Sequence, residues 1–385
     1  MLEKALSGDK RYWSWVAVLL IVIGTGTLFY LRQYHEGLTI TGLSRDVTWG
    51  FYIAQFTFLV GVAASAVMVV LPYYLHNYKA FGKITILGEF LAIGAVTMCM
   101  TFIFVDMGQP YRITNVFLHP SPSSLMFWDT ISVFGYLILN VIISQVTLGA
   151  ERKGIAPPNW IRPIIILSIP WAISIHTVTA FLYSGLAARP FWMTAILAPR
   201  FLASAFSGGP ALLILFCFIL RKFTKFDAGK EPIQKIALIV TYAMAVNMFF
   251  IGMELFTAIY SNIPEHISHF EFLFFGLDGN TTLVPWMWTS MILGIISLIL
   301  LINPGTRKNE TVLGFSCIIL ILSIWIDKGL GLVVAGFTPT PLGTVVEYVP
   351  TFPEIMITVG VYALGLLIIT GLYKIALSVR KQVTT

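Results

Sequence analysis

The recurrence of long apolar stretches constrains this chain more than any other feature. A helix that crosses the hydrocarbon core of a bilayer needs roughly 20 mainly apolar residues. Ten stretches of the sequence meet that requirement. They are residues 13–31, 51–75, 84–105, 125–148, 161–184, 199–220, 234–260, 283–303, 311–332 and 355–379. The sequence therefore predicts an all-α polytopic membrane protein, with residues 1–385 forming a single integral membrane domain.

Composition excludes the soluble classes of protein. Charged residues make up 11% of the chain and hydrophobic residues 57%, whereas about a quarter of a soluble domain is charged. The net charge of +6 would indicate a nucleic-acid partner in a soluble protein. Here we assign it to loops that orient the spans, so we expect contact with membrane lipid and none with nucleic acid.

The distribution of basic residues predicts the orientation of the spans. With ten spans, 18 of the 24 Lys and Arg residues fall on the side that carries both termini. The positive-inside rule makes that side cytoplasmic, in the cytoplasmic membrane. The N-terminal segment MLEKALSGDKRYWSW shows no small-residue cleavage pattern, so we expect the first span to remain as an anchor.

Three loops on the opposite side are long and distinctive in composition. Residues 106–124, 261–282 and 333–354 are rich in Pro, Gly and aromatic residues and poor in Lys and Arg. Each alone is compatible with an ordinary solvated connection. Three such loops on one face favour a docking platform for an extracytoplasmic partner.

Two spans share a sequence pattern at the end where each begins. GFYIAQFTFLVGVAASA (50–66) and PRFLASAFSGGPA (199–211) both combine aromatic with small residues, four spans apart. Small residues let membrane helices approach closely, although small-residue faces are common in such helices. The pattern predicts two parallel four-helix bundles, spans 2–5 and spans 6–9, with flanking helices.

One polar face in the fifth span has the chemistry of a quinone site. His176, Thr179 and Tyr183 share a helix face in the half of the span that points outward. A quinone headgroup needs hydrogen-bond partners at two oxygens and a route for two protons, which His and Tyr supply. The alternative is a structural histidine in the core.

Other ionisable residues within the spans each need an explanation, because a charge there costs about 2.5–3.5 kcal/mol. Asp106 and Asp129 lie at the outer interface, where carboxylates are often simply solvated. Glu254 shares a face with Asn247 and needs a partner or a proton. Glu89, near the inner end of its span, is either the mouth of a proton path or an ordinary acid at a helix end.

Most of these polar residues fall in the outer half of the membrane. His176, Tyr183, Glu254 and Arg200 share that half with the two aspartates just named. Asp327 and Lys328, near the outer end of the ninth span, are expected to pair with neighbouring residues. The sequence thus describes a hydrophilic half-site that faces outward.

Histidine and cysteine usage argues against a metal cofactor in this chain. Bis-histidine haem ligation needs two histidines at one depth on facing helices, and only His176 lies well inside a span. The three cysteines stand alone in apolar runs, without a CxxC pair. We therefore expect no haem, no iron–sulfur cluster and no metal site, so any redox function must use cofactors of a partner.

Four motifs in this order resemble the NrfD/PsrC family of integral membrane subunits. They are WGFYIAQFTFLVGVAASA (49–66), DMGQPYR (106–112), LYSGLAARPFW (182–192) and PRFLASAFSGGPA (199–211). Each is modest alone, and together they extend from residue 49 to residue 211 in the family's order. Ten spans and GFTPTPLGTVVEYVPTFPE (336–354) resemble most closely the long branch of the family, which includes DsrP of the DsrMKJOP complex and HmeB.

The resemblance implies a menaquinone or menaquinol site near the outer surface, beside an extracytoplasmic ferredoxin-like iron–sulfur subunit. It assigns quinone contact to Tyr183, in the motif Tyr-x-Gly, and to the region of Tyr52 and Gln55. His176, Asp129 and Asp106 join this site by position only. Proton movement through the four-helix units, proposed for some members, would involve Glu89, Asn247 and Glu254.

The leading hypothesis is a quinone-interacting subunit of a menaquinol:acceptor oxidoreductase complex of sulfur metabolism, rather than an enzyme that acts alone. The resemblance implies cytochrome b, cytochrome c and cytoplasmic iron–sulfur subunits as further partners. The alternative is a secondary transporter with a polar site at the midplane. The outward skew of the polar residues and the lack of a clearly broken span disfavour it. A haem-bearing cytochrome b is disfavoured by the histidine count.

Overall fold

The structure, a computed structural model, describes residues 2–384. Ten of its helices are long and apolar enough to cross a membrane, and no strand occurs in the described range. The predicted all-α polytopic fold and the number of spans are confirmed. The chain is a multi-pass membrane protein.

The spanning helices follow the predicted stretches and mostly extend beyond them. They are α1 (Lys10–Glu36), α2 and α3 (Phe51–Ala64 and Val67–Tyr74), α4 (Gly82–Asp106), α6 (Leu125–Lys153), α7 (Ile161–Ser184), α8 (Leu197–Phe223), α9 (Lys230–Ser261), α11 (Val284–Ile302), α13 with η6 and α14 (Glu310–Ile324, Trp325–Gly331 and Leu332–Ala335), and α15 (Phe352–Thr384). Short helices occupy the loops: η1 (Leu2–Lys4), η2 (Gly37–Ile40), η3 (Lys79–Phe81), η4 (Pro110–Arg112), α5 (Asn115–Leu118), η5 (Pro190–Trp192), α10 (Pro264–Phe274) and α12 (Pro304–Lys308).

Two spans depart from a regular α-helix, which the sequence did not predict. The second is interrupted between α2 and α3 at Ser65 and Ala66, both of which keep right-handed helical dihedral angles. The ninth contains a π-helical segment, η6, in which each turn holds about one residue more than in an α-helix. The chain continues in the same direction through both, but the α-helical hydrogen-bond pattern does not.

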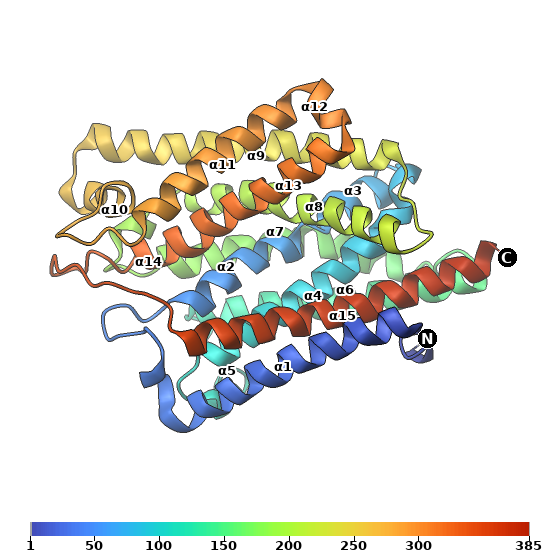
Figure 1. Cartoon of the computed structure of the whole chain (residues 1–385), viewed down its shortest axis with the longest axis horizontal. Coiled ribbons are helices and arrows are strands. Elements are labelled where there is room, and N and C mark those ends of the chain that lie inside the picture. The colour runs from blue at the N-terminus through green and yellow to red at the C-terminus, as the bar shows by residue number, and fades with distance from the viewer. Residues whose placement is uncertain (1, 385) are drawn as a thin grey trace.

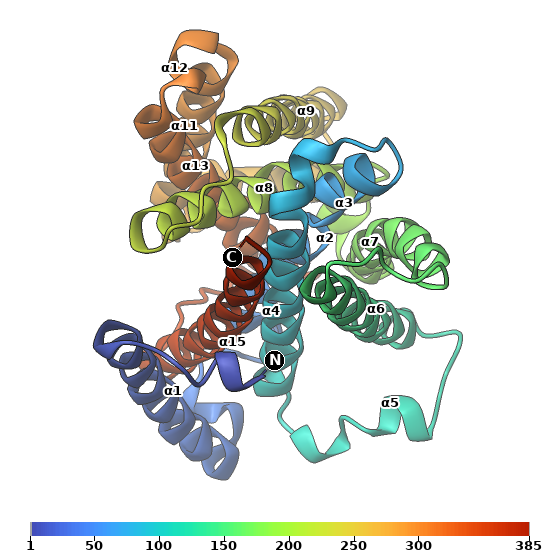
Figure 2. The same cartoon turned by 90° about the vertical axis from the view of Figure 1, so that its right-hand side faces the viewer.

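Contacts between helices join the central spans into two rings of four. In the first ring α2 packs on α4, α4 on α6, α6 on α7, and α7 on α2. In the second ring α8 packs on α9, α9 on α11, α11 on α13, and α13 on α8. The view along the helices shows the second set above the first, with α1 and α15 packed together at the edge of α4 (Figure 2). The contacts agree with two four-helix bundles, whose arrangement stays a prediction.

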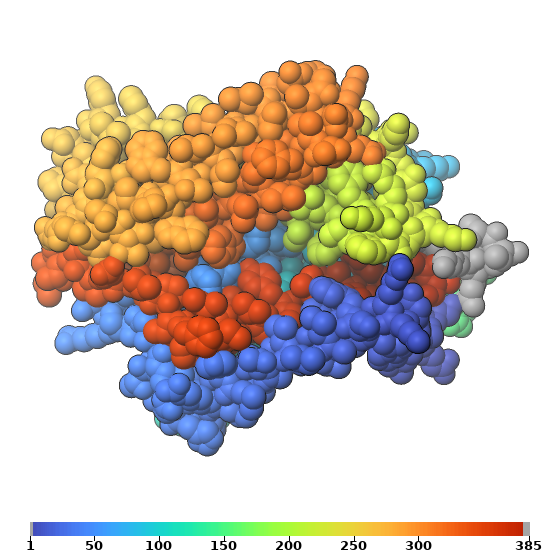
Figure 3. All heavy atoms as spheres, in the orientation of Figure 1, coloured from blue at the N-terminus to red at the C-terminus, as the bar shows by residue number. Residues whose placement is uncertain are grey.

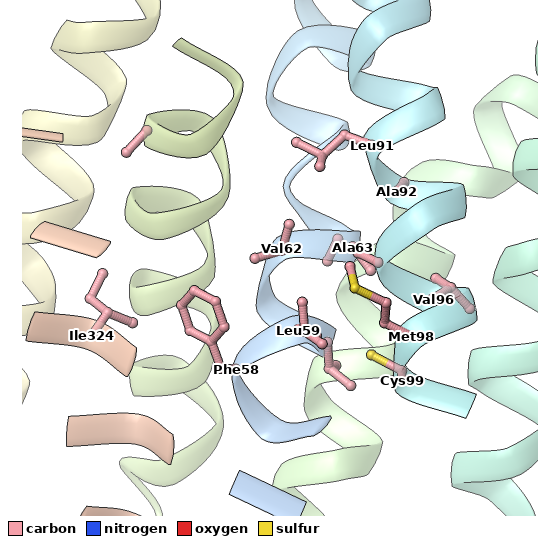
Figure 4. Packing of buried hydrophobic residues seen from close by; sticks show 14 of the residues in the cluster. Phe58, Leu59, Val62, Ala63, Leu91, Ala92, Val96, Met98, Cys99 and Ile324 are labelled. Carbon is pink, nitrogen blue, oxygen red and sulfur yellow. The ribbon is translucent and has the colours of Figure 1, made fainter. Parts of the chain in front are cut away.

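Helix α2 is the centre of the packing, because nearly all of it is buried. Phe58 lies on the side of α2 that faces α8, whereas Leu59 and Ala63 lie on the side that faces α4 (Figure 4). Small residues bring α2 and α8 close together. A Cβ added at Gly209 would lie 2.1 Å from the Cβ of Ser65, so the two rings meet where α2 is interrupted.

The two ends of the helical body differ in the loops that they carry. Both termini lie at one end, which we call the terminal face (Figure 1). The loops that follow α4, α9 and α14 lie at the other end, the long-loop face, and contain η4, α5 and α10. Along the side, the surface is hollowed between α13 and α15, where part of α2 is visible (Figure 3).

Candidate functional site

Tyr183 lies in the last turn of α7, near the long-loop face, and only 1% of it is exposed. Its hydroxyl lies 2.5 Å from Oγ1 of Thr57 on α2. The Thr57 hydroxyl donates its own proton to the carbonyl oxygen of Ile53, 2.7 Å away. A threonine hydroxyl has a single proton, so in this arrangement Tyr183 is the donor to Thr57.

Aromatic rings surround Tyr183 on the side of the long-loop face. Trp49 and Trp192 stack on each other and each meets the Tyr183 ring edge-on, with centroids 5.4 and 4.9 Å away. Phe201 of α8 meets Tyr183 at 6.0 Å, and Phe337 packs against both tryptophans. The surroundings fix the ring of Tyr183 and exclude water from it.

A cavity of about 350 Å³ opens beside this aromatic cluster. That volume falls within the range of small-molecule sites. Its lining combines the segment before α2, the turn after α7 and one residue after α14: Thr48, Trp49, Leu186, Ala187, Ala188, Arg189 and Phe337. The Arg189 guanidinium lies 4.4 Å from the centroid of the Phe337 ring and donates to the Phe337 carbonyl oxygen at 3.3 Å. Partial burial lowers the pKa of Arg189, which lies outside the spans.

Asp129 and His176 lie on the same side of the first ring as Tyr183. The hydroxyl of Thr179 on α7 lies 2.6 Å from Oδ1 of Asp129 on α6 and 2.7 Å from the carbonyl oxygen of Ile175, and Asp129 is only 4% exposed. It is therefore a buried carboxylate, not the solvated interface residue that the sequence also allowed. His176 is fully buried, and neither ring nitrogen has a hydrogen-bond partner among the described residues. A structural core histidine would be satisfied, so this imidazole is available to a bound oxygen or a proton.

The structure places Tyr52 and Asp106 in a separate cluster, between α1, α2 and α4. The Tyr52 hydroxyl donates to Oε1 of Gln33 at 2.7 Å, and Nε2 of Gln33 donates to the Val105 carbonyl oxygen at 2.6 Å. Oδ1 of Asp106 is buried without a partner in the described part of the chain. Both residues lie near the long-loop face, and the hydrogen bond of Tyr52 is to α1 and not to Tyr183.

Gln55 occupies a third position, between α2, η6 and α15. Its Oε1 accepts from Nε1 of Trp325 and from the hydroxyl of Tyr362, both at 2.7 Å. Its Nε2 is buried without a partner within residues 2–384. The predicted quinone residues therefore divide into a group around Tyr183 and two neighbouring clusters.

The second ring contains a cluster of buried charges that the sequence did not reveal. Arg200 of α8 donates to Glu254 of α9 and, through Nη2, to both carboxylate oxygens of Asp327 at 2.7 and 2.8 Å. Lys328, only 4% exposed, lies with its Nζ 4.4 Å from the centroid of the Phe201 ring. Asp327 thus pairs with a residue 127 positions away in sequence, and Glu254 has the partner that its burial requires.

The other two residues predicted for a proton path lie deeper in the protein. Glu89 of α4 is 1% exposed, and neither carboxyl oxygen has a partner among the residues described. Asn247, near the middle of α9, is equally buried with Oδ1 unpaired. Glu89 lies toward the terminal face and is not brought to Tyr183.

Sequence reasoning missed Thr57, Trp49 and Trp192. All three stand inside motifs that were singled out, within 49–66 and 182–192. The signal that could have found them is their position in these motifs, with a tryptophan and a threonine in the first and a tryptophan in the second. In the described part of the chain, no three or more His, Cys, Asp or Glu side chains are grouped so that they could hold a metal ion. This finding does not test the expected lack of haem and iron–sulfur clusters, which stays a prediction.

Comparison with known proteins extends over most of the chain. The family described as polysulphide reductase, NrfD, matches residues 39–337. A putative dimethyl sulfoxide reductase membrane subunit of Halobacterium salinarum is 27% identical, over 93% of this chain and 89% of its own length. An Hdr-like menaquinol oxidoreductase integral membrane subunit of Archaeoglobus fulgidus is 25% identical, over 95% and 93%.

A third relative is the integral membrane subunit of a menaquinone reductase from Nitratidesulfovibrio vulgaris. It is 21% identical, over 95% of this chain and 91% of its own length. The family match covers more than three quarters of the sequence, and it includes both helix rings and every residue around Tyr183. The chain therefore belongs to the polysulphide reductase NrfD family.

Proposed function

We propose that this protein is the quinone-interacting membrane subunit of a multi-subunit redox complex, with its quinone site at Tyr183, His176 and Asp129. One observation carries the proposal: a buried group of hydrogen-bonding side chains with an unpaired imidazole lies near a cavity at one end of a membrane protein. Relatives of nearly full length are named as menaquinol oxidoreductase and menaquinone reductase subunits, which favours menaquinone or menaquinol as the substrate.

The residues of the site match the needs of quinol chemistry. Oxidation of a quinol releases two protons and two electrons, so each hydroxyl oxygen needs a group that accepts its proton. The imidazole of His176 can accept one, and Asp129 is the nearest buried carboxylate on the facing helix. Tyr183 would hold a quinone oxygen by turning its hydroxyl away from Thr57. The same groups serve reduction in reverse.

The electron partner belongs at the long-loop face in this proposal. Tyr183 and the cavity lie near that face, and the chain's own described residues hold no metal-ligating cluster. We infer an extracytoplasmic ferredoxin-like iron–sulfur subunit docked there, with cytochrome b, cytochrome c and cytoplasmic iron–sulfur subunits in the same complex. The orientation follows the loop charges, with both termini cytoplasmic. The proposal also places this chain in the DsrP branch of the family and assigns its complex to sulfur metabolism.

Proton translocation is a further part of the proposal. Glu89 and Asn247 are buried with unpaired oxygens in the first and second rings, respectively. Such groups stabilise water or a proton in transit better than fully bonded ones do. Glu254, by contrast, is held by Arg200 and would take part only when that pair opens.

A secondary transporter is the second candidate, and the irregular spans favour it. Discontinuous helices are typical of transporter sites near the bilayer midplane. The interruption at Ser65 and the π-helix η6 are irregularities of that general kind. Against it, the ion-paired and hydrogen-bonded polar groups gather near the long-loop face instead of the midplane.

Two substitutions in the assembled complex test the quinone site. We expect Tyr183→Phe and His176→Ala to lower menaquinol oxidation by roughly 100-fold, the lower limit for loss of a proton-transferring group. Tyr242→Phe is the matched control, because Tyr242 is 67% exposed on α9. The measurement is quinol oxidation by purified complexes that hold equal amounts of every protein component. Full activity in both Tyr183 and His176 variants would rule out this pocket.

A further inference from the structure

Lys328 is a buried charge that the proposed quinone chemistry has not yet used. Its Nζ has no carboxylate oxygen within ion-pair distance among the described residues. The adjacent carboxylate, that of Asp327, is bound through both oxygens to Arg200. The one hydrogen bond of Nζ among the described residues is to the Phe201 carbonyl oxygen, at 3.5 Å. A buried ammonium held so weakly is costly and needs an explanation.

The ammonium lies one aromatic ring away from Tyr183. Phe201 presents its face to Nζ of Lys328, with the centroid 4.4 Å away. The same ring meets the ring of Tyr183 edge-on at 6.0 Å. A cation over an aromatic face is stabilised by the ring quadrupole, so Phe201 holds the charge of Lys328 in the second ring while packing against the site in the first.

Helix α2 leaves room for this charge. A Cβ added at Gly61 would lie 3.3 Å from Nζ of Lys328. Gly61 is one helical turn beyond Thr57, the hydrogen-bond partner of Tyr183. A narrow crevice between α2, α8 and the ninth span is lined by Gly61, Ser204 and Lys328, among others. The π-helical segment η6 delivers Lys328 to this crevice, and π-helical turns are frequent at functional sites.

We propose that Lys328 is a positioning residue of the quinone site, whose positive charge stabilises the negative charge that develops on a quinol oxygen as its proton leaves. The inference rests on the proposed function. One proton passes to His176 and the other to Asp129, and the two electrons pass to the iron–sulfur partner. The charge of Lys328 acts through Phe201 and Tyr183 and does not touch the substrate. In the reverse direction it stabilises the same charge before the proton arrives.

Several titratable and charged groups surround Lys328. The titratable and charged groups that act on it come from α4, α7, α8 and η6 itself: Cys99, His176, Arg200 and Asp327. Arg200 faces the two carboxylates of Asp327 and Glu254, so these three groups together leave one negative charge, which Lys328 balances. Lys328 is the cation of this cluster that lies over the face of Phe201, the ring that packs on Tyr183.

The test compares Lys328→Met, which removes the charge, with Lys328→Arg, which keeps it. In the purified complex, with a reduced dimethylnaphthoquinone as donor, we expect Lys328→Met to lower kcat roughly tenfold and leave KM unchanged. The pH profile of kcat should move to higher pH by about one unit, because proton loss is harder without the cation. Lys328→Arg should restore both. Lys225→Met, an exposed lysine at the terminal face, is the control.

Several outcomes separate this inference from the proposed function. If Lys328→Met keeps the wild-type kcat and pH profile while Tyr183→Phe is inactive, the role of Lys328 is wrong and the quinone site stands. If Lys328→Arg is as impaired as Lys328→Met, the charge is not the cause, and the inference fails. Full activity of Tyr183→Phe would instead overturn the quinone site itself.

A second variant covers the case in which Lys328→Met does not assemble. Gly61→Ala keeps the lysine but places a methyl group 3.3 Å from Nζ, which displaces the ammonium. We expect a smaller shift of the pH profile in the same direction. Gly371→Ala, where an added Cβ would meet nothing within 4 Å, is the matched control. A pH profile of Gly61→Ala equal to that of the control would contradict the inference.

Discussion

Arg200 joins three helices of the second ring through two carboxylates, so its substitution should lower the stability of the protein. Arg200→Gln would leave Glu254 and Asp327 buried without their counter-charge. Breaking such a buried pair costs about 3–5 kcal/mol. We expect a marked fall in the unfolding temperature of the purified protein in detergent.

The matched control is an arginine in an exposed ion pair. Arg221 pairs with Glu310 near the terminal face, with both side chains about one-third exposed. Exposed pairs contribute at most about 1 kcal/mol, so Arg221→Gln should change the unfolding temperature little. Equal effects of the two substitutions would contradict the structural role of Arg200.

At the residue scale, the sequence predicted which residues share one helix face, but not which residues of other helices they contact. His176, Thr179 and Tyr183 were grouped correctly because helical periodicity alone sets them on one side, and all three are buried. The partners Thr57 and Asp129 come from helices 126 and 50 residues away, respectively. Periodicity carries no information on which face of another helix will meet them.

At the scale of elements, the contact of α8 with α2 depends on Gly209. A Cβ there would lie 2.1 Å from Ser65 and 3.3 Å from the Cα of Val62, so the helices would have to separate. We expect Gly209→Ala to destabilise the protein by about 1–3 kcal/mol, the usual range for an overpacked core. The measurement is the unfolding temperature together with the yield of folded protein.

Gly252 on α9 provides the comparison, because an added Cβ would meet nothing within 4 Å. Ala is the better helix former by about 1 kcal/mol, so Gly252→Ala should be neutral or stabilising. A Gly209→Ala variant as stable as the wild type would show that the two rings do not rely on this close approach.

The spanning helices could be predicted from sequence, whereas their irregularities could not. Length and hydropathy are local properties, and the bilayer thickness fixes the number of residues that each span needs. The interruption at Ser65 and the π-helix at Trp325–Gly331 depend on tertiary contacts. One such contact is the 2.7 Å hydrogen bond that Nε1 of Trp325 donates to Gln55.

At the scale of the whole molecule, orientation in the membrane is the property to test first. The three native cysteines are buried, so an introduced cysteine can be labelled selectively. In intact cells we expect a membrane-impermeant thiol reagent to label Leu342→Cys, on the long-loop face, where Leu342 is 91% exposed. Lys225→Cys, on the terminal face, should be labelled only after permeabilisation. The opposite pattern would place the termini outside and reverse the proposed docking side.

The buried charges of the second ring also bear on how the chain enters the bilayer during synthesis. Arg200 and Glu254 are carried by consecutive spans, so a hairpin of α8 and α9 brings them together with no net charge. Asp327 and Lys328 are adjacent on η6 and enter together, again with no net charge. When α8 and α9 enter as a hairpin, this part of the interior holds no net charge before or after the ninth span follows. The order of the spans along the chain thereby spares the insertion machinery the cost of placing a lone ion in lipid.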